Sequence, residues 1–217
     1  FQHNKNVVEL LRERVPLTMA VTLVAMIFSW AVAVPIGIFS AVRQYSLFDY
    51  IFTFIGFIGL ATPSFLLALV ILWIALSRFG FSASGLFSSE FIDAPWSWAK
   101  FVDLLKHIWI PAIILGFSGT AGLIRTMRAN LLDELRQPYV VTARAKGLPE
   151  RKVILKYPVR IALNPFISTV GWMLPGLLSG ATIVSIVLSL PTNGPLMLKA
   201  LLSQDMYLAA SFVLLLS

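Results

Sequence analysis

Two long stretches without a charged residue constrain the fold more than any other feature of this chain. Residues 15–42 and 50–77 contain no Asp, Glu, Lys, Arg or His. As a helix, each stretch would reach about 42 Å, which exceeds the roughly 30 Å hydrocarbon core of a bilayer. Only 12% of the chain is charged and 58% is hydrophobic, whereas about a quarter of an ordinary soluble domain is charged. The sequence therefore predicts an all-α protein, a polytopic bundle of transmembrane helices.

Short polar segments divide the chain into about five predicted spans. These spans cover residues 15–42, 50–77, 108–128, 165–190 and 206–217. Residues 1–14 form a polar external segment ahead of the transmembrane domain, 15–217, which includes a cytoplasmic region at 129–160. Because the sequence begins at Phe1 and ends within an apolar run, we expect a parent chain of six spans, with the first one missing here and the last one truncated.

Charge predicts the orientation of these spans. Of the net charge of +7, residues 125–160 contribute +6 and residues 1–14 contribute +1, while the other polar segments are each neutral. Lys and Arg are enriched in cytoplasmic loops of membrane proteins, so residues 125–160 are predicted to be cytoplasmic. Alternation of the spans then places the 43–49 turn on the same side and residues 78–107 outside.

The predicted spans lack the groups that several functions require. Proton- or ion-coupled transporters usually carry ionisable residues inside the membrane, and the span interiors have none. The chain has no cysteine, its two histidines (His3 and His107) are expected at the surface, and no Gly-rich phosphate loop with a following Lys is present. We therefore expect no metal site, no catalytic residue and no ATP site in this chain, so uphill transport would need an energised partner.

The basic stretch 125–160 contains the signals of two short helices. Pro138 suits a first helical position, Arg144 and Lys146 suit a last turn, and Gly147 suits the left-handed residue after a helix. Pro149 and Glu150 then suit the start of a second helix. The sequence predicts a helix from Pro138 to Lys146 that Gly147 ends.

This stretch resembles the cytoplasmic signature of ABC-importer permeases, in the branch that includes dipeptide, oligopeptide, glutathione and nickel permeases. The branch favours Thr-Ala-Arg-Ala-Lys-Gly-Leu, which is present at 142–148, and Arg-x-Ala-Leu-x-Pro, which is present at 160–165. The glutamate of the wider family pattern is absent, because Val141 occupies its place. The segment 190–195 also departs from the branch's usual Pro-Gly-Leu-Gly-like turn, so the resemblance identifies the family more specifically than the substrate.

The resemblance implies a transport subunit of a prokaryotic plasma (inner) membrane, not an enzyme. It implies a second homologous permease, two ATP-binding cassette subunits that bind ATP and Mg²⁺, an external solute-binding protein and membrane lipid as partners, and no cofactor on this chain. The residues that it implies for coupling to the ATPase are Tyr139, Thr142, Ala143, Arg144, Ala145, Lys146, Gly147, Leu148, Pro149 and Glu150.

The resemblance favours peptides as the substrate, with nickel or another small solute as the alternative. Uncharged groups are expected to line the translocation path, near Thr62, Ser64, Asn164, Thr169 and Trp172. Two other classes of function are also considered. One is a secondary transporter or channel that acts alone. The other is a nucleic-acid binder that uses the basic helices, but only about 36 residues separate the flanking spans and nucleic acid is not an expected partner.

Overall fold

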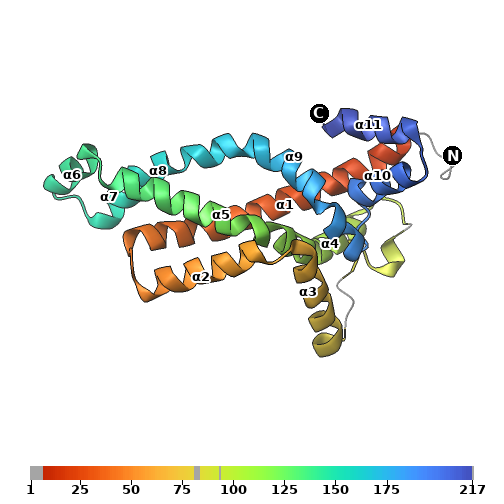
Figure 1. The fold of residues 1–217 in the computed structure, drawn as a ribbon, viewed down its shortest axis with the longest axis horizontal. Coiled ribbons are helices and arrows are strands. Elements are labelled where there is room, and N and C mark those ends of the chain that lie inside the picture. Colours follow the sequence, from red (N-terminus) through yellow and green to blue (C-terminus); the bar gives the residue numbers. More distant parts are fainter. Residues whose placement is uncertain (1–6, 81–83, 93, 217) are drawn as a thin grey trace. The chain divides into compact units, whose positions relative to one another are not determined.

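The computed structural model describes residues 7–80, 84–92 and 94–216, except for the side chains of residues 79, 118, 169–170, 172–181 and 215–216. Every element in this described part is helical, which confirms the predicted all-α class (Figure 1). The elements are α1 (Val7–Val42), α2 (Leu47–Ala61), α3 (Ser64–Phe79), η1 (Ser89–Phe91), α4 (Trp98–His107), α5 (Trp109–Leu135), α6 (Pro138–Ala145), α7 (Glu150–Lys156), α8 (Pro158–Ala162), α9 (Asn164–Val187), α10 (Asn193–Leu202) and α11 (Met206–Leu216).

Length and composition identify α1 as a membrane span by itself. Among the described residues, two further spans are counted only if an interrupted pair of helical pieces forms each one: Leu47–Ala61 with Ser64–Arg78, and Trp98–Phe117 with Gly119–Leu135. α1 starts at Val7, eight residues before the uncharged stretch, because the polar segment ahead of it is also compatible with a helix.

Pro63 divides the stretch 50–77, which was predicted as one span, into two helices. Thr62 has extended backbone (φ −88°, ψ 119°) and α3 begins directly after Pro63. Proline disfavours helical backbone in the residue before it and has no N–H to donate. The second predicted span is therefore two separate helices, α2 and α3.

The chain divides into two compact units. Unit 1 consists of residues 1–27, 63–116 and 173–217, and unit 2 consists of residues 28–62 and 117–172. α1, α5 and α9 each contribute one part to each unit.

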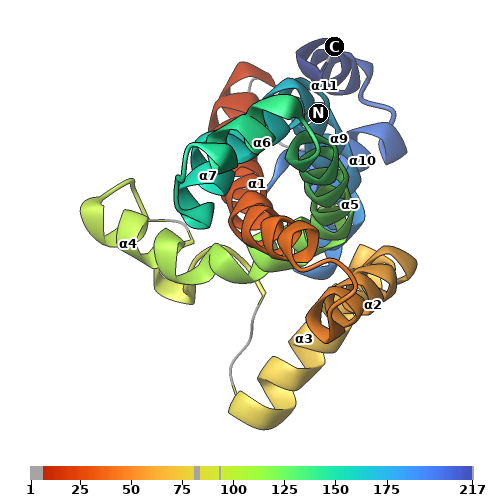
Figure 2. The same ribbon diagram turned by 90° about the vertical axis from the view of Figure 1, so that its left-hand side faces the viewer.

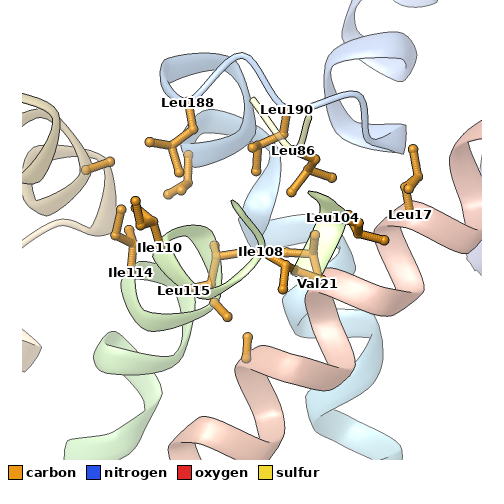
Figure 3. Close-up of a cluster of buried hydrophobic side chains, with 14 of the residues drawn as sticks. Leu17, Val21, Leu86, Leu104, Ile108, Ile110, Ile114, Leu115, Leu188 and Leu190 are labelled. Atoms are coloured by element: carbon orange, nitrogen blue, oxygen red, sulfur yellow. The ribbon is translucent and has the colours of Figure 1, made fainter. Parts of the chain in front are cut away.

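Apolar side chains from several helices form the core of unit 1. Figure 3 shows Leu17 and Val21 of α1 with Ile108, Leu188 and Leu190 around the same cluster. The cluster also includes Leu86, Leu104, Ile110, Ile114 and Leu115. Van der Waals packing of these side chains thus joins segments that are distant in the sequence.

Buried polar contacts hold parts of the segment before α4 against that helix. Lys100 is 7% exposed, and its Nζ donates to the carbonyls of Ile92 (3.3 Å) and Ala94 (2.7 Å). Asp103 accepts from the backbone N–H and the hydroxyl of Ser88, both at 2.7 Å. The charges that cancel in the sequence are therefore partly buried and used to hold this loop.

In unit 2, the second part of α1 packs closely against α5. A Cβ added to Gly37 of α1 would lie 2.6 Å from Met127 Cβ and 3.1 Å from the Ile124 carbonyl oxygen. Phe39 contacts the rings of Phe48 and Phe52 edge-on, which adds α2 to the same packing. Only a residue without a side chain fits at position 37.

Gly37→Ala is therefore expected to lower the free energy of unfolding by about 1–2 kcal/mol, because the extra methyl overpacks the helix contact. The matched change Gly122→Ala, also within a helix of unit 2, meets no atom within 4 Å and is expected to raise stability by about 0.5 kcal/mol. Unfolding of the full chain in detergent, followed by circular dichroism, checks both. Equal effects of the two changes would contradict the close contact at Gly37.

Candidate functional site

The helix predicted from Pro138 is present as α6. Pro138 occupies its first turn after the N-cap Gln137, which has extended backbone (φ −69°, ψ 147°). The Thr142 hydroxyl donates to the Pro138 carbonyl at 3.0 Å, and the N–H of Lys146 donates to the Thr142 carbonyl at 3.1 Å. The last helical residue is Ala145 and Lys146 is the C-cap, which agrees with the predicted end to within one residue.

Gly147 supplies the reversal between α6 and α7. Its φ is +72°, in the left-handed region that is costly for residues with a Cβ. Its N–H donates to the Arg144 carbonyl at 2.9 Å. Pro149 then caps α7, and its carbonyl accepts from the N–H groups of Lys152 and Val153 at 2.8 and 3.1 Å. The local sequence thus encodes the whole helix–turn–helix.

A small apolar core joins the two helices. Val140 and Ala143 of α6 pack against Val153 of α7, and all three are buried, with Tyr139, Leu148 and Tyr157 around them. Figures 1 and 2 both show α6 and α7 side by side. Short helices are marginal alone in water, so this core stabilises the α6–α7 pair. Of the predicted coupling residues, Tyr139, Ala143 and Leu148 serve this packing.

The opposite face of α6 is open. Thr142, Arg144 and Ala145 are exposed there, as are Lys146 and Gly147 at its end. Val141, which was not among the predicted site residues, is 59% exposed. Its neighbours Val140 and Ala143 face α7, so the helical phase places Val141 outward, but the sequence alone does not show which side of α6 meets α7. The exposed apolar side chain of Val141 is available for contact with a partner outside this chain.

Arg144 and Glu150 form an ion pair across the turn. The Arg144 Nη2 lies 2.6 Å from Glu150 Oε1, and its Nε lies 3.1 Å from Oε2. Hydrogen bonding to Arg144 lowers the pKa of Glu150, and the same bond raises the pKa of Arg144. Their side chains are 44% and 54% exposed, so the pair contributes less than about 1 kcal/mol. The pair therefore restrains the turn between α6 and α7 but adds little to the stability of unit 2.

Tyr139 connects the start of α6 to the end of α5. Its hydroxyl donates to a carboxylate oxygen of Glu134 in a short hydrogen bond. Burial of the phenol, and then this bond, raise the pKa of Tyr139 from 10.0 to about 12. The neutral phenol is therefore the form that the folded structure favours.

This raised pKa predicts a pH dependence at the alkaline end. Because the pKa is higher in the folded chain, the stabilisation by Tyr139 is complete below pH 10 and is lost as the pH rises towards about 12. Titration of phenolate absorbance should show one tyrosine that ionises near pH 12 in the wild type, absent in Tyr139→Phe. If the tyrosine that Tyr139→Phe removes is one that ionises near pH 10, the contact with Glu134 is contradicted.

A second ion pair, largely buried, joins α2 and α5 in unit 2. Arg128 of α5 donates to both carboxylate oxygens of Asp49, from Nε at 3.1 Å and from Nη2 at 3.0 Å. The backbone N–H of Tyr45 donates to the same carboxylate at 3.0 Å, and Asp49 is 3% exposed. The pair joins the 43–49 turn to the 125–160 stretch, in agreement with the prediction that both lie on one side of the membrane. No sequence pattern had paired them.

The structure describes the side chains of three of the five residues predicted for the translocation path. Thr62 ends α2, and its hydroxyl donates to the Ile58 carbonyl at 2.8 Å. Ser64 is the first residue of α3. Asn164 is exposed at the start of α9. It lines a cavity of about 290 Å³ in unit 2, and Thr62 is not part of that lining. The side chains of Thr169 and Trp172 lie outside the described residues.

Comparison with known proteins matches most of this chain to one family. The family described as "Binding-protein-dependent transport system inner membrane component" matches residues 33–217. The chain is 35% identical over 197 residues to the oligopeptide transport system permease protein AppB of Bacillus subtilis, with 91% of this chain and 61% of that protein covered. It is 32% identical over 216 residues to the dipeptide transport system permease protein DppB of Alkalihalophilus pseudofirmus, with 93% and 65% covered.

The oligopeptide transport system permease protein OppB of Mycobacterium bovis is 30% identical over 205 residues, with 93% of this chain and 63% of that protein covered. The chain thus spans about three fifths of the length of these curated relatives. The matched residues include both helices of the α6–α7 pair and the helices that lead into it. The chain belongs to the family of inner-membrane components of binding-protein-dependent transport systems.

Proposed function

We propose that this chain forms part of the permease subunit of an ATP-driven importer of peptides, and that the α6–α7 pair receives motion from a separate ATP-binding subunit. The observation that carries the proposal is the structure of this pair within a chain of this family. α6 buries Val140 and Ala143 against α7 and leaves its other face open. A helix held on one face only is suited to dock in a partner.

The contacts of α6 explain how a push on it would reach the spans. Tyr139 bonds to Glu134 at the end of α5, and α7 leads through α8 into α9. A displacement of the α6–α7 pair would therefore move the ends of α5 and α9 together. This chain catalyses no reaction in the proposal and binds no cofactor, because ATP and Mg²⁺ are bound by the partner subunit.

Peptides are the proposed substrate class, since the relatives described above are named as oligopeptide and dipeptide permeases. The proposed path is lined by uncharged groups that include Thr62, Ser64, Asn164, Thr169 and Trp172. Neutral polar groups would tolerate varied peptide side chains, which leaves selectivity to an external binding protein. A second homologous permease and two ATPase subunits complete the proposed transporter.

The proposal is tested with the full-length permease in proteoliposomes together with its partner permease, its ATPase subunits and its binding protein. Uptake of a labelled oligopeptide should require both ATP and the binding protein. Uptake of the same peptide by the permease alone, without ATP, would instead identify a secondary transporter or channel. Transport of Ni²⁺ in place of the peptide would replace the proposed substrate and leave the coupling mechanism intact.

A further inference from the structure

The outer face of α7 and α8 carries a group of cations that the proposed coupling does not use. Four basic residues and one leucine line an open depression of about 370 Å³ in unit 2: Arg151, Lys152, Leu155, Lys156 and Arg160. Residues 151–160 contain no Asp or Glu. The four cations are hereafter called the basic face.

These cations have no acidic partner in the part of the chain that the structure describes. The ion pairs found there use other basic residues, and Glu150, the nearest carboxylate in sequence, is bound to Arg144. Lys156 lies over the ring of Tyr157, with its Nζ 5.5 Å from the ring centroid. The basic face is therefore an exposed positive surface without a carboxylate partner among the described residues, and such a surface attracts anionic partners.

Leu155 makes this surface amphipathic. Its side chain is 58% exposed although its neighbours Val153 and Ile154 are buried. Exposed apolar residues among Lys and Arg are typical of segments that lie at a membrane interface, where the apolar side chain enters the headgroup boundary and the cations meet phosphates.

The position of the basic face in the chain also favours the membrane. Arg160 precedes the start of α9 at Asn164 by four residues, which is about 6 Å along a helix. Ile161 and Ile167, at and after this junction, are 42% and 67% exposed, as expected for side chains that face lipid. The cations thus lie about one helical turn before α9, next to exposed apolar side chains. Residues 125–160 are predicted to be cytoplasmic, and clusters of Lys and Arg at the cytoplasmic end of a span bind anionic headgroups.

We propose that the basic face binds the phosphates of anionic phospholipids in the cytoplasmic leaflet, with Leu155 inserted among the headgroups. The inference goes beyond coupling to an ATPase, because it assigns a different surface of the same helix pair to a different partner. The exposed side of α6 remains free for a protein, while α7 rests on the membrane. Lipid binding would then hold the α6–α7 pair at a fixed height relative to the bilayer.

The test uses the absence of cysteine from these 217 residues. Leu155→Cys and Val141→Cys each place one environment-sensitive label on an exposed apolar position of α7 or α6. The full-length permease, without ATPase subunits, is reconstituted into vesicles of phosphatidylcholine with or without phosphatidylglycerol. Quenching by lipids that carry a nitroxide on the headgroup then reports whether each label contacts the membrane.

We expect strong quenching at position 155 in vesicles that contain phosphatidylglycerol and little at position 141. Each cation near an anionic surface contributes about fivefold in binding, so Lys152→Gln with Lys156→Gln should raise the phosphatidylglycerol content needed for half-maximal quenching severalfold. Added salt should likewise raise the phosphatidylglycerol content needed for half-maximal quenching, because it screens the charges. The control Lys106→Gln with Lys199→Gln removes the same charge from two exposed positions of unit 1 and should leave quenching at 155 unchanged.

Two results would overturn the inference. One is equal, low quenching at positions 141 and 155 at every lipid composition. The other is shielding of position 155 only after the ATPase subunits are added, which would make the basic face a protein contact. Because quenching is measured without ATPase or substrate, its failure is distinguishable from failure of ATP-dependent uptake, which is a separate measurement. Unchanged melting in neutral detergent shows that the exposed Lys→Gln changes leave the fold intact.

Discussion

Gly147→Val is expected to reduce ATP-dependent peptide uptake tenfold or more in the reconstituted transporter. Gly147 has φ +72° and nothing within 4 Å of the position where its Cβ would lie, so the effect comes from the backbone and not from a clash. A β-branched residue is a clear outlier at positive φ, and the left-handed conformation costs it about 1–2 kcal/mol or more. That cost is comparable to the stability of a short helix, so the α6–α7 reversal should be lost.

The matched control for this change is Gly80→Val. Gly80 follows α3 with φ +67° and also has nothing within 4 Å of its Cβ position, so the backbone strain is the same. Gly80 lies outside the α6–α7 pair, and its change should leave uptake near the wild-type value. The measurement is the rate of uptake per transporter, with membrane insertion checked for both variants. Equal losses at the two glycines would contradict a coupling role for α6.

Asp49→Ala is expected to lower the free energy of unfolding by about 3 kcal/mol. Removal of one partner of a buried ion pair leaves the other charge desolvated and unpaired, which typically costs 3–5 kcal/mol. Arg128 is 27% exposed in its side chain, so water partly compensates it and the lower end applies. Chemical unfolding of the full chain in detergent measures the change.

The exposed pair of the same unit supplies the comparison. Glu150→Ala removes the partner of Arg144, but both side chains are about half exposed, and such pairs contribute about 0–1 kcal/mol. The double variant Asp49→Ala with Arg128→Ala should recover part of the loss, because no unpaired charge remains. If Asp49→Ala costs no more than Glu150→Ala, the Asp49–Arg128 pair does not stabilise unit 2.

Features of the candidate site that depend on a few neighbouring residues were predictable. The start of α6 at Pro138, its end before Gly147 and the restart after Pro149 each follow from backbone chemistry that acts within one helical turn. Pro63 had the same local signal, but the sequence did not distinguish a kink from the break between α2 and α3. Local rules specify where a helix is weakened, and the surrounding packing decides whether it continues.

Features that need distant residues were not predictable. Asp49 and Arg128 are separated by 79 positions, and nothing in the hydrophobic pattern pairs them. In the sequence, Lys100 is one of several charges that cancel in a neutral segment. In the structure it is buried and bonded to two carbonyls. The outward position of Val141 required the phase of α6 relative to α7. Such contacts depend on which helix faces meet, and that is set by packing over the whole unit.

The motifs identified the family, and the sequence also predicted the all-α membrane class, a cytoplasmic location for residues 125–160 and the helix–turn–helix centred on Gly147. These follow from hydropathy, charge and backbone preferences, which each residue carries wherever it lies. Packing in the folded chain sets which side of that pair is buried, which side is open and where its charges are compensated. Arg144 and Asp49 have partners in unit 2, whereas the basic face has none among the described residues. That difference depends on distances between side chains, which folding alone creates.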